Sequence, residues 1–219
     1  MSINSQAVNQ ASRGRPALPL DRIVGAALEL VDEQGADALS MRSLAQRLGS
    51  GTATLYRHFA NRAELVAMVV DTMLGEVTFD ASTTWDDACT SFAQNMFDAL
   101  GRHGNVARLL IGQVPLGPNA VQHRELLLSV LLDNGFAPET AAHIYATLSR
   151  YILGFAMQVA GSATAEQRDA EVSAAFHRLD PGRYPATVTV ADELPVPLAS
   201  EFAFGLRLMM AGLEHRKTQ

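Results

Sequence analysis

The side chains best suited to bind a partner lie within residues 40–62, SMRSLAQRLGSGTATLYRHFANR. Two short stretches with helical apolar spacing are joined there by a turn containing Gly49 and Gly51, which is typical of a helix-turn-helix. In that motif the second helix enters the DNA major groove and the first crosses the backbone. Threonine can contact a base edge, arginine can bind guanine or a phosphate, and a tyrosine hydroxyl can bind a phosphate. The candidate DNA-binding residues are Arg42, Thr52, Ala53, Thr54, Tyr56, Arg57, His58 and Arg62.

The charge is unevenly distributed along the chain, and its sum is −6. Residues 1–62 contain seven arginines and five acidic residues, a balance of +2, which leaves a balance of −8 for the rest. A basic module joined to an acidic body favours an anionic partner for the N-terminal part. The helix pair alone also fits a structural role, with Arg57 and Arg62 as solvated surface charges and Tyr56 as packing. Motif and charge together favour double-stranded DNA.

The elements that position these residues are all expected to be helices. Apolar residues recur with helical spacing from Leu20 to Val31, and Gly35 is placed to end that helix. Ser40 is a good N-cap for the next helix, and Asn61 with Glu64 has the spacing of a capping box. No segment has convincing strand alternation, so an all-α fold is predicted. Further helices are expected at Trp85–Gly101, Val106–Gln113, Asn119–Asn134, Pro138–Val159, Glu166–Leu179 and Ser200–Glu214.

Several classes of protein are disfavoured by what the chain lacks. Cys89 is the single cysteine, which excludes an internal disulfide framework and a multi-cysteine zinc site. No apolar run reaches the roughly 18–20 residues that span a bilayer, and the polar start resembles no signal peptide, so we expect a cytoplasmic protein without membrane contact. No G-x-S-x-G or nucleotide loop is present, so neither an enzyme nor a cofactor is expected. The histidines show no metal-ligand spacing to one another, so no metal is expected: His103, His123, His143 and His177.

The last helix suggests a second subunit. Its apolar residues lie on nearly all sides, which in a soluble protein requires burial on more than one face. A subunit interface would bury the additional face, so a homodimer is expected.

The segment LSMRSLAQRLGSGTATLYRHFANRAELVAMVVD resembles the DNA-binding domain of the tetracycline-repressor (TetR) family. The family's L-A-x-x-L-G turn is matched by Leu44-Ala45 and Leu48-Gly49, and its L-Y-x-H-F by residues 55–59, with a basic residue at Arg62. The match covers Leu20 to Met73 and continues more weakly through the C-terminal domain. Ser50 departs from the valine that the family usually places in the turn.

The resemblance implies a homodimer whose last two long helices form a four-helix bundle, here Pro138–Val159 and Ser200–Glu214. The two recognition helices would then lie about 34–36 Å apart and bind a palindromic operator. The resemblance also places five residues in the dimer interface: Leu153, Phe202, Leu206, Met209 and Met210.

The resemblance further implies an effector pocket in the C-terminal domain. Leu110 stands where tetracycline repressors have a metal-binding histidine, and the neighbouring positions are Phe92, Met96, Gln113 and Leu127. Tyr145 and Ser149, one turn apart on one helix face, are candidate polar contacts. We therefore expect a small hydrophobic or aromatic effector with few charged groups, bound without metal. Each apolar residue of this set also fits an ordinary core position.

These predictions divide the chain into four parts. Residues 1–17 are expected to be a flexible basic arm, 18–62 the helix-turn-helix domain, 63–80 a connecting helix and linker, and 81–219 the effector-binding and dimerisation domain. The predicted function is a DNA-binding transcriptional repressor released from its operator by the effector. Two alternatives remain: an all-α carrier or enzyme with a structural helix-turn-helix, and a DNA-binding protein without a ligand.

Overall fold

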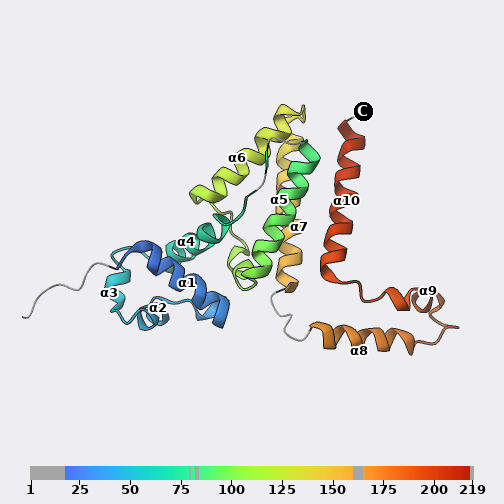
Figure 1. Cartoon of the computed structure of the whole chain (residues 1–219), viewed down its shortest axis with the longest axis horizontal. Helices are drawn as coiled ribbons and strands as arrows, with labels where there is room; N and C mark the ends of the chain where they lie inside the picture. The colour runs from blue at the N-terminus through green and yellow to red at the C-terminus, as the bar shows by residue number, and fades with distance from the viewer. Residues whose placement is uncertain (1–17, 79, 82–83, 160–164, 218–219) are drawn as a thin grey trace, which may run out of the picture.

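The computed structural model describes residues 18–78, 80–81, 84–159 and 165–217, so the predicted basic arm at 1–17 lies outside the described residues (Figure 1). Every regular element in these ranges is helical, and none of the described residues forms a strand. The all-α prediction is confirmed. None of the described helices has the length and apolar character that a membrane crossing requires.

The N-terminal module is built around a small apolar core. Ile23, Leu44, Leu55 and Phe59 are at most 1% exposed and bring its helices together. Gly35 ends the first helix with a φ of 90°, a backbone conformation that favours glycine. The elements are α1 (Leu20–Gln34), η1 (Ala36–Ala38), α2 (Met41–Arg47), α3 (Thr52–Leu55) and α4 (Arg62–Leu74).

The C-terminal body is centred on two long helices that pack side by side, α5 (Trp85–Arg102) and α7 (Pro138–Val159) (Figure 1). Helix α6 (Pro118–Asp133) packs against both and reaches α4, while α10 (Leu198–Lys217) lies beside α5 and α7. Helices α8 (Ala165–His177) and α9 (Pro185–Thr189) extend away from this group together with η4 (Ala191–Glu193). The predicted segment 106–113 is helical only over η2 (Val106–Leu110), and α9 was not predicted.

Helix α4 belongs to both parts, because it packs against α1 and α6. Its buried Asp71 accepts hydrogen bonds from the backbone nitrogens of Asn119 (3.3 Å) and Ala120 (3.0 Å) and from the Asn119 amide (3.1 Å). A carboxylate from one helix therefore caps the N-terminus of another. Gly117 makes this approach feasible, since a Cβ there would lie 2.3 Å from Asp71 Cγ.

A second set of polar contacts joins the two parts. The His103 ring, at the end of α5, lies between Asp32 of α1 (Nδ1–Oδ2 2.7 Å) and Glu76 after α4 (Nε2–Oε2 3.2 Å). Asn105 donates to the backbone oxygen of Asp32. The N-terminal module is thus attached to the body through both α1 and α4.

Candidate functional sites: a helix-turn-helix surface and an interior cavity

The loop between α2 and α3 is shaped by local hydrogen bonds. Ser40 caps α2 by accepting from the Ser43 nitrogen, and Ser43 Oγ accepts from the Ser40 nitrogen, both at 3.0 Å. Gly49 adopts a φ of 57° in the turn, and the Ser50 nitrogen donates to the Ala45 carbonyl oxygen. These contacts fix where α3 begins.

Helix α3 presents a polar surface at the end of the molecule farthest from α10 (Figure 1). Thr52, Ala53 and Arg57 are exposed, and the Tyr56 side chain is 56% exposed although it is aromatic. Arg42 is exposed on the neighbouring α2. Thr54 and His58 are half-buried, so less of each is available to a partner. The surface can offer hydroxyl groups, a methyl group and two guanidinium groups to a duplex.

Arg62 has a structural role beside the predicted one. Its Nε donates to the Leu39 carbonyl oxygen (2.6 Å) and its Nη2 to that of Ala36 (3.1 Å). These bonds connect the start of α4 to the segment before α2, so Arg62 stabilises the module while its side chain stays exposed. The capping box beside it is formed in a modified way: the Glu64 nitrogen donates to Asn61, and Glu64 accepts from Ala60 rather than from Asn61.

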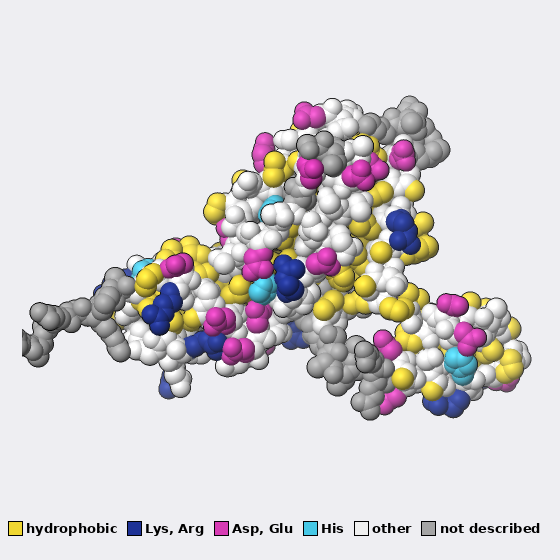
Figure 2. Space-filling model, in the orientation of Figure 1, with side chains coloured by type: hydrophobic (Ala, Val, Ile, Leu, Met, Phe, Trp, Pro, Cys, Tyr) yellow, Lys and Arg dark blue, Asp and Glu magenta, His cyan; other side chains and the backbone are white. Residues whose placement is uncertain are grey.

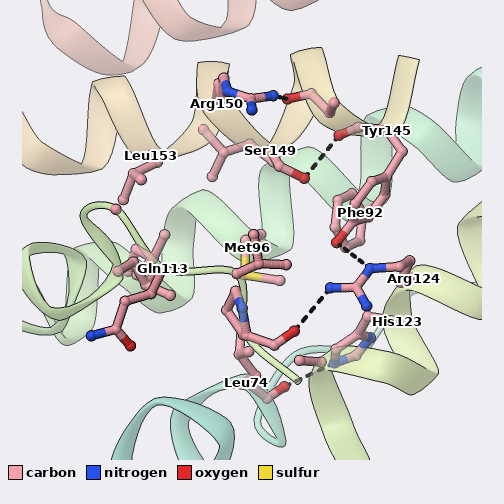
Figure 3. A pocket seen from close by; sticks show the side chains of 18 residues that line it. Leu74, Phe92, Met96, Gln113, His123, Arg124, Tyr145, Ser149, Arg150 and Leu153 are labelled. Carbon is pink, nitrogen blue, oxygen red and sulfur yellow. Dashed lines mark hydrogen bonds between the residues drawn. The ribbon is translucent and has the colours of Figure 1, made fainter. Parts of the chain in front are cut away.

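The body contains a cavity of about 500 Å³ bounded by α5, α6, α7, the end of α4 and the loop after η2 (Figure 3). Six of the seven predicted effector residues line it: Phe92, Met96, Leu110, Gln113, Tyr145 and Ser149. The seventh, Leu127, is wrongly assigned, because its side chain is fully buried in the core and does not reach the cavity. Leu110 lines the wall as an apolar group. Among the described residues, no three His, Cys, Asp or Glu side chains are arranged to hold a metal ion.

One side of the cavity is polar, and it contains Arg124 and His123 beside the predicted Tyr145. Arg124 of α6 donates from Nε to the Tyr145 hydroxyl (3.3 Å) and from Nη2 to the Pro115 carbonyl oxygen (2.9 Å). Its guanidinium carbon lies 5.6 Å from the centre of the Tyr145 ring. His123 Nε2 lies 2.9 Å from the Leu74 carbonyl oxygen at the end of α4. Cavity and DNA-facing module therefore meet at α6 and α4.

The rest of the lining is mostly apolar. Met96 and Leu153 face the cavity from α5 and α7, and Phe92 of α5 lies beside the polar group, with its ring centre 6.4 Å from that of His123 (Figure 3). Ser149 donates to the Tyr145 carbonyl oxygen within α7 (2.8 Å), so its hydroxyl proton is already engaged. A ligand here would meet apolar surface over most of the lining and the donors of Arg124 beside Phe92.

Three of the five predicted dimer residues, Phe202, Leu206 and Met210, need correction, while Met209 and Leu153 are partly exposed and remain predictions. Leu153 lines the cavity, and Phe202, Leu206 and Met210 are buried within their own chain. Phe202 stacks on Phe97 with ring centres 4.2 Å apart. Met209 is only partly buried. Periodicity shows that α10 is apolar on several sides, but it cannot tell which side meets α5 and α7.

The side of α10 that remains uncovered carries different residues. Phe204 is 56% exposed and Leu208 is 59% exposed, one helical turn apart. Figure 2 shows hydrophobic side chains along this edge of the molecule. An apolar face of this kind on the described part of the chain is typical of a subunit interface.

Comparisons with known proteins agree with this geometry. Residues 23–69 match the family described as "Bacterial regulatory proteins, tetR family", and residues 79–217 match "Tetracyclin repressor-like, C-terminal domain". The HTH-type transcriptional repressor DrrR1 of Streptomyces coeruleorubidus is 29% identical over 216 residues, covering 93% of this chain and 80% of that protein.

Two solved structures of ActR from Streptomyces coelicolor are similar over most of the chain. The apo structure is 31% identical with a TM-score of 0.84, covering 93% of this chain and 98% of that one. The complex with actinorhodin is also 31% identical, with a TM-score of 0.83, covering 91% and 96%.

Proposed function

This chain belongs to the tetR family of bacterial regulatory proteins, and we propose that it represses transcription from a palindromic operator until a small aromatic molecule fills its cavity. One observation carries the proposal: a solvent-facing helix-turn-helix surface and a separate cavity in the body are joined by α4. The relative ActR has been crystallised in complex with actinorhodin, which supports a small-molecule ligand for this chain. The proposal makes the chain a regulator rather than an enzyme.

The DNA-binding part rests on the exposed side chains of α2 and α3. Arg57 and Arg42 can neutralise phosphates, and each phosphate contact steepens the dependence of log affinity on log salt by about 0.9. The test uses a duplex that the protein itself selects from a random-sequence library. Arg57→Ala should weaken binding and flatten the salt slope by about 0.9. Arg178→Ala, an exposed arginine after α8, is the matched control and should leave the slope unchanged.

A salt slope near zero in the unsubstituted protein would exclude this function and favour a carrier. The same outcome for Arg57→Ala as for Arg178→Ala would exclude α3 as the DNA-binding surface.

Effector control follows from linkage between the two sites. A ligand that lowers operator affinity must bind the protein–operator complex more weakly than the free protein, by the same factor. The corresponding coupling free energy is typically about 1–3 kcal/mol. The contacts of α6 with α4, through Asp71 and through His123 and Leu74, are the route we propose. A nearly complete switch would require about 5.5 kcal/mol of differential affinity.

The homodimer is proposed from the outer face of α10. Burying Phe204 and Leu208 against a second copy would remove apolar surface from water. Leu208→Glu should therefore shift the protein toward monomers in sedimentation experiments and abolish tight binding to a palindromic duplex. Glu214→Gln, on the same helix, serves as the control. Monomeric behaviour of the unsubstituted protein at micromolar concentration would exclude the proposal.

A further inference from the structure

The charged side chains that line the cavity all have the same sign. The two ionised side chains of the lining, Arg124 and Arg150, are both cations, and none of the described lining residues is an aspartate or a glutamate. The rest of the chain beyond residue 62 carries a balance of −8. A basic lining inside an acidic body indicates selection for a negatively charged ligand rather than a general surplus of arginine.

Arg124 is the group best placed to bind such a charge. It is only partly exposed, and no described carboxylate lies within 4.0 Å of its nitrogens. Its recorded hydrogen bonds use Nε and Nη2 and both go to neutral oxygens, those of Tyr145 and Pro115. A half-buried cation without an anionic partner is unfavourable, and a ligand carboxylate would offset that desolvation.

The geometry also holds the guanidinium group in place before a ligand arrives. The Tyr145 hydroxyl and the Pro115 carbonyl oxygen fix it from two sides, and its plane lies near the Tyr145 ring (Figure 3). Ordering a long side chain in advance reduces the entropy lost on binding. Arg150 is different: it is exposed and donates to the Ala146 carbonyl oxygen of its own helix, away from Arg124.

We propose that the effector is a planar aromatic acid. Its ionised carboxylate or comparable acidic group would bind Arg124, and its rings would lie on the apolar wall formed by Phe92, Met96 and Leu153. This inference rests on the proposed function of the cavity as the effector site. It makes the expectation of an effector with few charged groups more specific, because it assigns one acidic group and the residue that binds it.

The test uses two probes of nearly the same shape and different charge, anthracene-2-carboxylate and anthracene-2-carboxamide. Both are fluorescent, so their dissociation constants can be measured at pH 7.5 on the full chain. The carboxylate should bind at least about tenfold more tightly, as expected for a charge-assisted hydrogen bond. Arg124→Met should reduce this ratio to about one, with most of the loss falling on the carboxylate. Arg124→Lys should retain part of the ratio, and Arg150→Met should retain most of it.

Equal binding of the two probes to the unsubstituted protein, or an unchanged ratio in Arg124→Met, would overturn the proposal while leaving the cavity as a binding site for neutral aromatic molecules. Failure of both probes to bind would also overturn it. The salt dependence of DNA binding is measured without any effector, so it tests the regulatory function separately. Loss of carboxamide binding in Arg124→Met would show that Arg124 only holds the wall together, and would likewise contradict the proposal.

Discussion

Replacing Asp71 by alanine should uncouple the two halves of the molecule. The substitution removes three hydrogen bonds, two from backbone nitrogens in the first turn of α6 and one from the Asn119 side chain. Loss of a helix cap costs about 0.5–2 kcal/mol, and buried donors left without an acceptor cost about 1–3 kcal/mol more. We therefore expect the free energy of unfolding to fall by about 3 kcal/mol.

Denaturant titration measures this change. Trp85 is the single tryptophan, is buried, and lies edge-on to Phe136, so its fluorescence reports unfolding of the body. Asp71→Asn keeps one oxygen acceptor and should lose about half as much stability. Asp169→Ala, on the exposed side of α8, is the control and should change stability by less than about 0.5 kcal/mol.

The same variants test the coupling of the two sites. If the cap transmits the state of the cavity to α4, Asp71→Asn should retain both DNA and probe binding while the effect of one on the other decreases. A loss of less than about 1 kcal/mol in Asp71→Ala would refute the assignment of Asp71 as an interhelical cap.

Three further results are expected. Gly25→Ala places a methyl group in α1 where no atom lies within 4 Å, so it should stabilise the module by about 0.5–1 kcal/mol, measured as a raised Tm. Burial raises the pKa of the Cys89 thiol to about 12, so at pH 8 a thiol reagent should react only as the protein unfolds. The Arg47 guanidinium, hydrogen-bonded to Glu33, lowers the pKa of that carboxyl group. The stabilisation by the Glu33–Arg47 pair is therefore present at neutral pH and lost as the pH falls through the lowered pKa of Glu33. In Glu33→Gln, the free energy of unfolding should depend less steeply on pH in the acid range.

The parts of the fold that depend on neighbouring residues could be predicted. Gly35 and Gly135 end their helices with positive φ, and Ser40 and Asn61 begin theirs with the expected side-chain caps. Each of these signals acts within a few residues, so the sequence contains all of the necessary information. The α2–turn–α3 segment was predictable for the same reason.

The parts that depend on distant contacts were harder to predict. Nothing near Arg62 indicates that Leu39, more than 20 residues away, would accept its hydrogen bond. The inward side of α10 depends on the position of Phe97 in α5, and helical periodicity contains no such information. Arg124 was missed because a charged residue in an amphipathic helix is usually exposed, whereas here the fold turns it toward a cavity.

In the N-terminal module, the residues that stabilise the fold and the residues exposed for a partner are different ones, and this affects how such a protein can evolve. Leu55 of α3 and Phe59 just after it supply the buried contacts, while Thr52, Ala53 and Arg57 are exposed. Substitutions at exposed positions of this kind typically change stability by no more than about 0.5 kcal/mol each. A duplicated gene can therefore acquire a new target site through a few surface codons while the ancestral scaffold stays intact.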